Sequence, residues 1–167
     1  ISPMDGFRAV LLRSRRAAHF ALAFAVHRMD HDAAVIQEAA LLHDFVELLL
    51  WLYVPTAALE IRARLAGQPG LRSAVAQQAI LGATLPDLQH ELMQKWRLPG
   101  LLVDITDDHR ETLSVQARNV FLAIRLARHT AKGWDNPALP DDVRDVARLL
   151  NMGTEPTLAL LEDIDAQ

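Results

Sequence analysis

The segment Ala39-Ala40-Leu41-Leu42-His43-Asp44 ends an apolar, helix-forming run with an adjacent histidine and aspartate. Such a doublet can present one imidazole and one carboxylate to a single metal ion. A second apolar run, Leu48-Leu49-Leu50, follows closely, so we expect Asp44 to be largely buried. A buried carboxylate is costly unless a charged partner or a metal ion compensates it. Pairing with a buried arginine and ligation of a metal explain the doublet equally well.

Apolar residues recur at helical spacing along the whole chain, interrupted by proline and glycine. Residues 17–26 are apolar on every side, so the helix that contains them is expected to be central. Residues 134–142 are expected to form a loop that ends in a helix N-terminal signature. The sequence predicts an all-α domain without strands, with helices over residues 4–29, 33–53, 56–66, 71–82, 87–96, 101–107, 113–132, 143–151 and 156–165.

The composition agrees with one helical domain. The chain has 167 residues, of which 51% are apolar and only 5% aromatic, and this mixture suits packed helices better than a β-sandwich. The net charge of −4 does not indicate a basic surface of the kind that binds nucleic acid. The absence of cysteine excludes disulfides and thiolate metal sites. No apolar stretch is long enough to span a membrane and no signal peptide is visible. We therefore expect a cytoplasmic protein that binds neither nucleic acid nor membrane.

Two further side chains are candidates for a site near the doublet. His19 lies in the apolar part of the first helix, where a hydrogen-bonded core histidine is favoured over a metal ligand. Glu47 follows His43 by one helical turn and could share its face. For Glu47, an exposed helix charge is favoured over a role in the site.

Arg125 and Arg128 interrupt an otherwise apolar run over residues 120–128. A core helix tolerates an arginine when its guanidinium meets a buried carboxylate. We expect one of the two arginines to reach such a group, and Asp44 is the candidate partner.

Taken together, these segments resemble the HD superfamily of metal-dependent phosphohydrolases, and more closely its regulatory offshoot, the HD-related output domain (HDOD) family. The resemblance covers roughly residues 13–150 and rests on the order of the segments. They are the His19 helix, Ala39-Ala40-Leu41-Leu42-His43-Asp44, Ile80-Leu81-Gly82, Lys95-Trp96-Arg97-Leu98-Pro99, Ile105-Thr106-Asp107-Asp108-His109 and residues 122–131.

The resemblance implies a ligand set for a metal ion. In catalytic HD proteins, a histidine on one helix, the doublet on the next and a later aspartate hold a metal that activates water. His19, His43 and Asp44 match three of these positions. The later aspartate falls at Arg128, whose positive charge would oppose a metal ion.

Three more positions depart from the catalytic pattern. Glu47 stands close after the doublet, where catalytic members carry a basic residue, and would repel a phosphate. Leu85 replaces an expected histidine, and Asp108-His109 replaces a pair of histidines. We therefore expect the ancestral metal site to be eroded.

The resemblance implies an HD-domain-like bundle of about 8 to 10 helices. We expect residues 1–167 to form a single domain that lacks part of the family's N-terminal helical subdomain. The exposed apolar face left by that loss would be covered by self-association into a homo-oligomer.

The implied function is that of a non-catalytic bacterial signalling or regulatory domain that binds a protein partner or a small ligand and needs no cofactor. His19, His43 and Asp44 would form a buried polar cluster beside Glu47, closed by Arg125 or Arg128. The alternative is a metal-dependent phosphohydrolase or phosphodiesterase that holds a divalent metal with His19, His43 and Asp44. A purely structural helical scaffold is a third interpretation.

Overall fold

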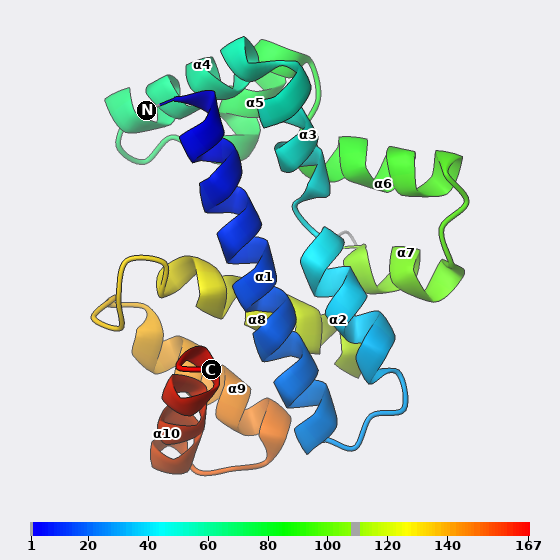
Figure 1. Cartoon of the computed structure of the whole chain (residues 1–167), viewed down its shortest axis with the longest axis vertical. Helices are drawn as coiled ribbons and strands as arrows, with labels where there is room; N and C mark the ends of the chain where they lie inside the picture. The colour runs from blue at the N-terminus through cyan, green and yellow to red at the C-terminus, as the bar shows by residue number, and fades with distance from the viewer. Residues whose placement is uncertain (1, 108–110) are drawn as a thin grey trace. The chain divides into compact units, whose positions relative to one another are not determined.

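The computed structural model describes residues 2–107 and 111–167, and every regular element in this part of the chain is a helix (Figure 1). The all-α prediction is confirmed. No helix in the described part is both long enough and apolar enough to cross a membrane. The helices are α1 (Pro3–His27), α2 (Ala33–Leu42), α3 (Phe45–Tyr53), α4 (Pro55–Gly67), α5 (Ser73–Leu81), α6 (Leu85–Lys95), α7 (Gly100–Thr106), α8 (Val115–His129), α9 (Leu139–Leu150) and α10 (Thr154–Asp165).

The predicted helix over residues 33–53 is two helices, and the break falls on the His43-Asp44 doublet. Helix α2 ends at Leu42, and Asp44 is the N-cap residue of α3 with φ −104° and ψ 20°. Aspartate competes with helical hydrogen bonding through its own side chain and therefore favours caps and turns. Apolar periodicity continues across the break, which is why the spacing alone predicted one helix.

The predicted loop over residues 134–142 is shorter than expected, because α9 begins at Leu139. Pro140 occupies the first turn of α9, where its missing N–H costs no hydrogen bond. The N–H of Asp142 already donates to the carbonyl of Ala138 at 3.1 Å. Asp142 is therefore a helical residue, and its side chain has a fixed direction.

The described residues fall into two compact units, each assembled from separate stretches of chain. Unit 1 comprises Ile1–Leu11 and His43–Leu98, and unit 2 comprises Leu12–Leu42 and Pro99–Gln167. Helix α1 begins in the first and continues in the second. Because each unit combines stretches that are distant in sequence, the composition along the chain could not delimit them. That residues 1–167 form a single domain stays a prediction.

Unit 1 is built around α3, which packs against both α4 and α6, while α4 packs against α5 (Figure 1). Its apolar cluster consists of Val10, Trp51 and Ala58, with half-buried neighbours that include Phe7 and Leu48. The Trp51 side chain, 6% exposed, is the largest member of the cluster. Burial of one aromatic side chain contributes roughly 2–3 kcal/mol.

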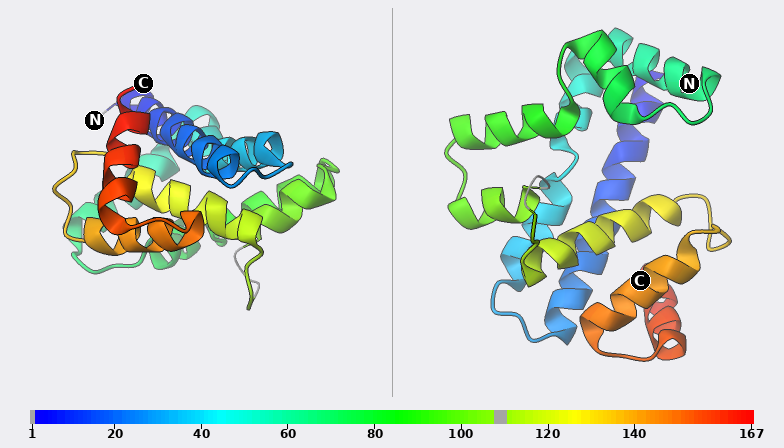
Figure 2. Two further views of the ribbon diagram at one scale, coloured as in Figure 1. Left: turned by 90° about the horizontal axis from the view of Figure 1, so that it is seen from below. Right: turned by 180° about the vertical axis from the view of Figure 1, so that it is seen from behind.

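Unit 2 is built around α8, which contacts α2, α7 and α9, and α10 in turn crosses α9 (Figure 2). The buried positions of α8 include Val120, Ala123, Leu126 and Ala127, each 0% exposed. These residues recur every three or four positions, as an amphipathic helix requires. The long helix predicted over residues 113–132 is thus a core element, although it ends at His129.

The second half of α1 is buried on one side only. Phe20, Phe24 and Ala25 are at most 1% exposed, whereas Val26 is 60% exposed and His19 is also exposed. Residues 17–26 are thus apolar on every side but covered on only one of them. An apolar composition all round a helix does not dictate how many neighbours surround it.

We predict that Gly6→Ala destabilises the protein by about 1–3 kcal/mol through overpacking. A Cβ atom at Gly6 would lie 2.6 Å from three ring atoms of Trp51, and a ring held in a core cannot move away freely. Urea unfolding followed by circular dichroism at 222 nm measures the loss. Gly67→Ala is the matched control, because a Cβ there meets nothing within 4 Å. Equal stability of the two variants would contradict the prediction.

Candidate functional site

The side chains of the His43-Asp44 doublet are hydrogen-bonded to each other in the turn between α2 and α3. Nδ1 of His43 donates a hydrogen bond to Oδ1 of Asp44 at 2.9 Å, and the two side chains are 20% and 13% exposed. This bond selects the tautomer of His43 that carries its proton on Nδ1. Nδ1 of His43 and Oδ1 of Asp44 thus serve as donor and acceptor to each other.

The residue that follows the doublet packs against the tryptophan of the family-like segment. The rings of Phe45 and Trp96 lie 5.6 Å apart between centroids, at 35°. Trp96 caps α6, and Arg97 adopts left-handed backbone with φ 52°, so that the N–H of Leu98 donates to the carbonyl of Met93 at 3.1 Å. The segment Lys95-Trp96-Arg97-Leu98-Pro99, on which the family resemblance partly rests, therefore supports the start of α3 within unit 1.

The other predicted members of the polar cluster do not share the burial of the doublet. Glu47 lies half-buried in the first turn of α3, in unit 1 with the doublet. His19 and Arg128 belong to unit 2, and both are exposed. The expectation that these two residues are buried polar groups is wrong, because each lies opposite the buried face of its helix. Asp108-His109, where the resemblance expects a pair of histidines, lies outside the described residues.

A metal site needs at least three protein ligands around one point. Within residues 2–107 and 111–167, no three His, Asp or Glu side chains are placed to hold a metal ion. The described residues of neither unit therefore complete, by themselves, the ligand set that the HD resemblance implies. The described donors do not fit a resident metal, and we derive no metal-dependent step from them.

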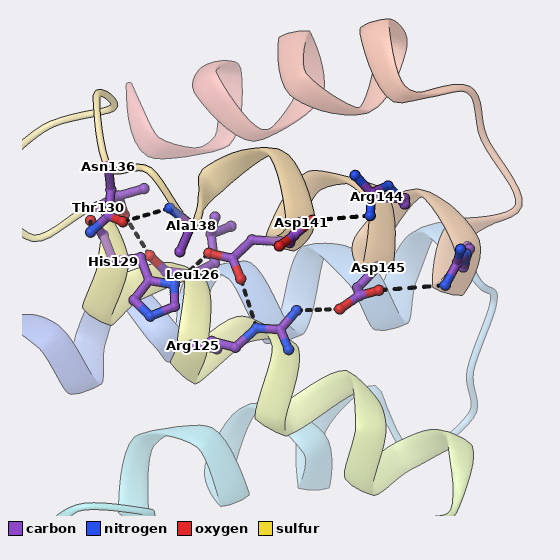
Figure 3. A network of polar contacts seen from close by, with 11 residues as sticks. Arg125, Leu126, His129, Thr130, Asn136, Ala138, Asp141, Arg144 and Asp145 are labelled. Carbon is purple, nitrogen blue, oxygen red and sulfur yellow. Dashed lines mark hydrogen bonds and ion pairs between the residues drawn. The ribbon is translucent and has the colours of Figure 1, made fainter. Parts of the chain in front are cut away.

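Arg125 pairs with two carboxylates of α9, which are not the partner expected from the sequence (Figure 3). Its Nε lies 2.7 Å from Oδ1 of Asp142, and its Nη2 donates a hydrogen bond to Oδ2 of Asp145. Asp44 was the expected partner. Asp142 and Asp145 take its place because α8 packs directly on α9 in unit 2.

The surroundings of Arg125 stabilise its charge. Burial alone would lower the pKa of the Arg125 guanidinium, but the hydrogen bond to Asp145 and the negative charges of Asp142 and Asp145 outweigh it and raise that pKa. The guanidinium is therefore a permanent cation in this cluster.

His129 completes this charged cluster from the last turn of α8. Its Nδ1 donates to Oδ2 of Asp142 at 2.6 Å, and the Asp142 side chain is only 3% exposed. The side-chain amide of Asn136 donates to the carbonyl of His129 at 3.1 Å and accepts from the N–H of Ala138 at 2.9 Å (Figure 3). The buried carboxylate is thus held between an imidazole and a guanidinium, the arrangement that a buried charge requires.

Sequence reasoning missed Asp142, although a signal for it existed. The buried residues Leu139, Val143, Val146 and Leu150 form the apolar stripe of α9, and Asp142 falls on the same stripe. An aspartate on an apolar stripe predicts a charged partner on the facing helix. The shorter expected helix, over residues 143–151, hid this signal by leaving Asp142 in a loop.

A second charged centre, partly buried, lies at Arg16. Its Nε and Nη2 donate to the two carboxylate oxygens of Asp165 at 2.9 Å each. Its Nη1 donates to the carbonyl of Ala127 at 3.1 Å, and its Nη2 also donates to the hydroxyl of Thr130 at 2.8 Å. The indole N–H of Trp134 donates to Asp165 at 3.2 Å. One guanidinium therefore joins α1, α8 and α10 within unit 2.

We predict that Asp142→Asn lowers the free energy of unfolding by about 2–3 kcal/mol, because it leaves the Arg125 cation without its most buried counter-charge. Chemical denaturation measures the change. Asp141→Asn is a close control, since Asp141 also lies in the first turn of α9 but is 74% exposed, in a surface pair with Arg144. It should leave stability nearly unchanged. A comparable loss in both variants would show that helix-end electrostatics, and not the buried cluster, is responsible.

Comparison with known proteins identifies the fold and the family. The model of the HDOD domain matches residues 3–112, and no curated protein matches the sequence. Among solved structures, a crystal structure from Shewanella amazonensis SB2B named "putative phosphohydrolase" is similar, with a TM-score of 0.69 and 18% sequence identity. The match covers 92% of this chain but only 58% of that one, and at this identity it shows a shared fold. Because the family model covers more than half of the sequence, this chain belongs to the HDOD domain family.

Proposed function

We propose that the protein is a non-catalytic signalling or regulatory domain of the cytoplasm that binds a protein partner. The observation that carries this proposal is the state of the doublet. His43 and Asp44 are bonded to each other, and no third ligand joins them among the described residues of their unit. The residues that mark the family thus serve the structure of a turn.

The role proposed for the doublet is to end α2 and start α3. Side chains at adjacent positions of a helix do not face each other, so the hydrogen bond between His43 and Asp44 fits a turn better than a continuing helix. The turn places Phe45 where it supports Trp96. Loss of the bond would loosen the start of α3 without removing any chemical step.

The charge near the doublet is unfavourable for a phosphate ester. Phosphoryl chemistry needs cations or hydrogen-bond donors around the transferred group. Glu47, in the first turn of α3, adds a second carboxylate in the same stretch as Asp44. This arrangement argues against an anionic substrate at the doublet.

An exposed aromatic surface beside the doublet supports a binding role. Trp96 is 57% exposed although its ring packs on Phe45. Tryptophan contributes strongly to protein–protein contacts when it is held in a fixed orientation. A partner that covers Trp96 would therefore respond to the position of Phe45, the residue that follows the doublet at the start of α3.

The proposal is tested with purified protein by elemental analysis and by hydrolysis of bis(p-nitrophenyl) phosphate with added manganese. We expect less than stoichiometric transition metal and no turnover above that of the buffer. Asp44→Asn should instead lower the unfolding free energy by at most about 1 kcal/mol, because its amide oxygen can still accept the hydrogen bond of His43 but lacks the negative charge that strengthens it.

The control is Asp163→Asn, an exposed position of α10. Stoichiometric metal, together with turnover that Asp44→Asn abolishes and Asp163→Asn retains, would refute the proposal. The protein would then be the metal-dependent phosphohydrolase of the alternative interpretation.

A further inference from the structure

A groove of about 640 Å³ lies in the C-terminal part of unit 2, beyond residues 3–112 that match the family. It is formed by the loop after α8 and the first turns of α9 and α10. Its volume falls in the range of ligand-binding clefts, about 300–1,000 Å³. Neither the doublet nor the charged cluster of Asp142 lines it.

The groove combines an aromatic wall with an aliphatic floor. Trp134 supplies the aromatic side chain, and Leu139, Val143 and Leu158 supply the aliphatic ones. Leu139 and Val143 are buried in the core of unit 2, so the floor cannot move without disturbing α9.

The loop side of the groove is held in place by hydrogen bonds. The indole N–H of Trp134 donates to Asp165 at 3.2 Å. Asn136, which also lines the groove, bridges the carbonyl of His129 and the N–H of Ala138 (Figure 3). A site whose walls are already fixed loses less conformational entropy when a ligand binds.

The charges at the groove favour a cation. Asp135 and Glu155 line it, and neither makes a hydrogen bond or ion pair through its carboxylate in the part of the chain that the structure describes. Arg144 also lines it, but its guanidinium is paired with Asp141 at 3.0 Å (Figure 3). Two unpaired carboxylates beside an indole attract a positive charge that can also lie over the ring face.

We propose that this groove binds a peptide segment of a partner protein in which a lysine or arginine stands next to a bulky apolar residue. The apolar side chain would pack on Leu139, Val143 and Leu158, and the cation would lie near Trp134, Asp135 and Glu155. This inference goes beyond the proposed function, because it names a second surface and the chemistry of its partner. It does not depend on the state of the doublet.

The test is calorimetric titration of the full chain with an acetylated, amidated hexapeptide of alternating leucine and lysine. Two matched peptides replace lysine by glutamate or leucine by serine. We expect saturable one-to-one binding of the first peptide and binding about tenfold weaker, or none, for the other two. Equal binding of the glutamate peptide, or no binding of the lysine peptide, would overturn the proposal.

Two variants show whether binding occurs at the groove. Glu155→Lys should lower the affinity for the lysine peptide about fivefold, because the attraction between two exposed charges becomes a repulsion. Glu162→Lys makes the same change of charge at an exposed position of the same helix that does not line the groove, and should leave the affinity unchanged. Equal weakening by both would show non-specific attraction to the net charge and refute the site.

Analytical ultracentrifugation of the free protein decides whether a second copy is the occupant. A monomer, or a dimer that Glu155→Lys does not affect, agrees with the proposal. A dimer that the lysine peptide cannot compete with and that Leu158→Ser dissociates would overturn it. None of these outcomes changes the metal content or the hydrolysis assay, so the two proposals fail independently.

Discussion

The guanidinium of Arg16 joins three helices of unit 2, which are α1, α8 and α10. It binds both oxygens of Asp165 near the end of α10, and it also binds a carbonyl and a hydroxyl near the end of α8. Only arginine offers donors in the fork geometry that such a set of acceptors needs. Through Asp165 the same centre orients Trp134, which lines the groove. The packing of three helices and the shape of a candidate binding surface thus share one charged centre.

The doublet shows why a recognisable motif does not by itself establish a function. The sequence offered His43 and Asp44 as possible metal ligands, and in the structure their side chains are hydrogen-bonded to each other in the turn between α2 and α3. The next residue, Phe45, packs its ring on Trp96. Function must therefore be argued from the complete ligand set and not from its most recognisable pair.

Many of the ion pairs and hydrogen bonds described above lie in the part of the chain beyond the residues that match the family. The Arg125, His129 and Asp142 cluster and the groove all fall after residue 112. Paired buried charges favour one arrangement of helices over its alternatives. If either partner is displaced, the other is left as an unpaired buried charge, which costs free energy. The C-terminal helices therefore present a defined surface that lies outside the residues matched by the family model.

The sequence by itself determined the helical class, the positions of most helices and the family, because helical periodicity and the order of short motifs are local properties of the chain. It also indicated that one of Arg125 and Arg128 meets a buried carboxylate. Only the tertiary structure decided that the partners are Asp142 and Asp145, that His19 and Arg128 are exposed, and that the helix breaks at the doublet. Periodicity shows which face of a helix is apolar, but which helix covers that face depends on packing between residues far apart in the chain.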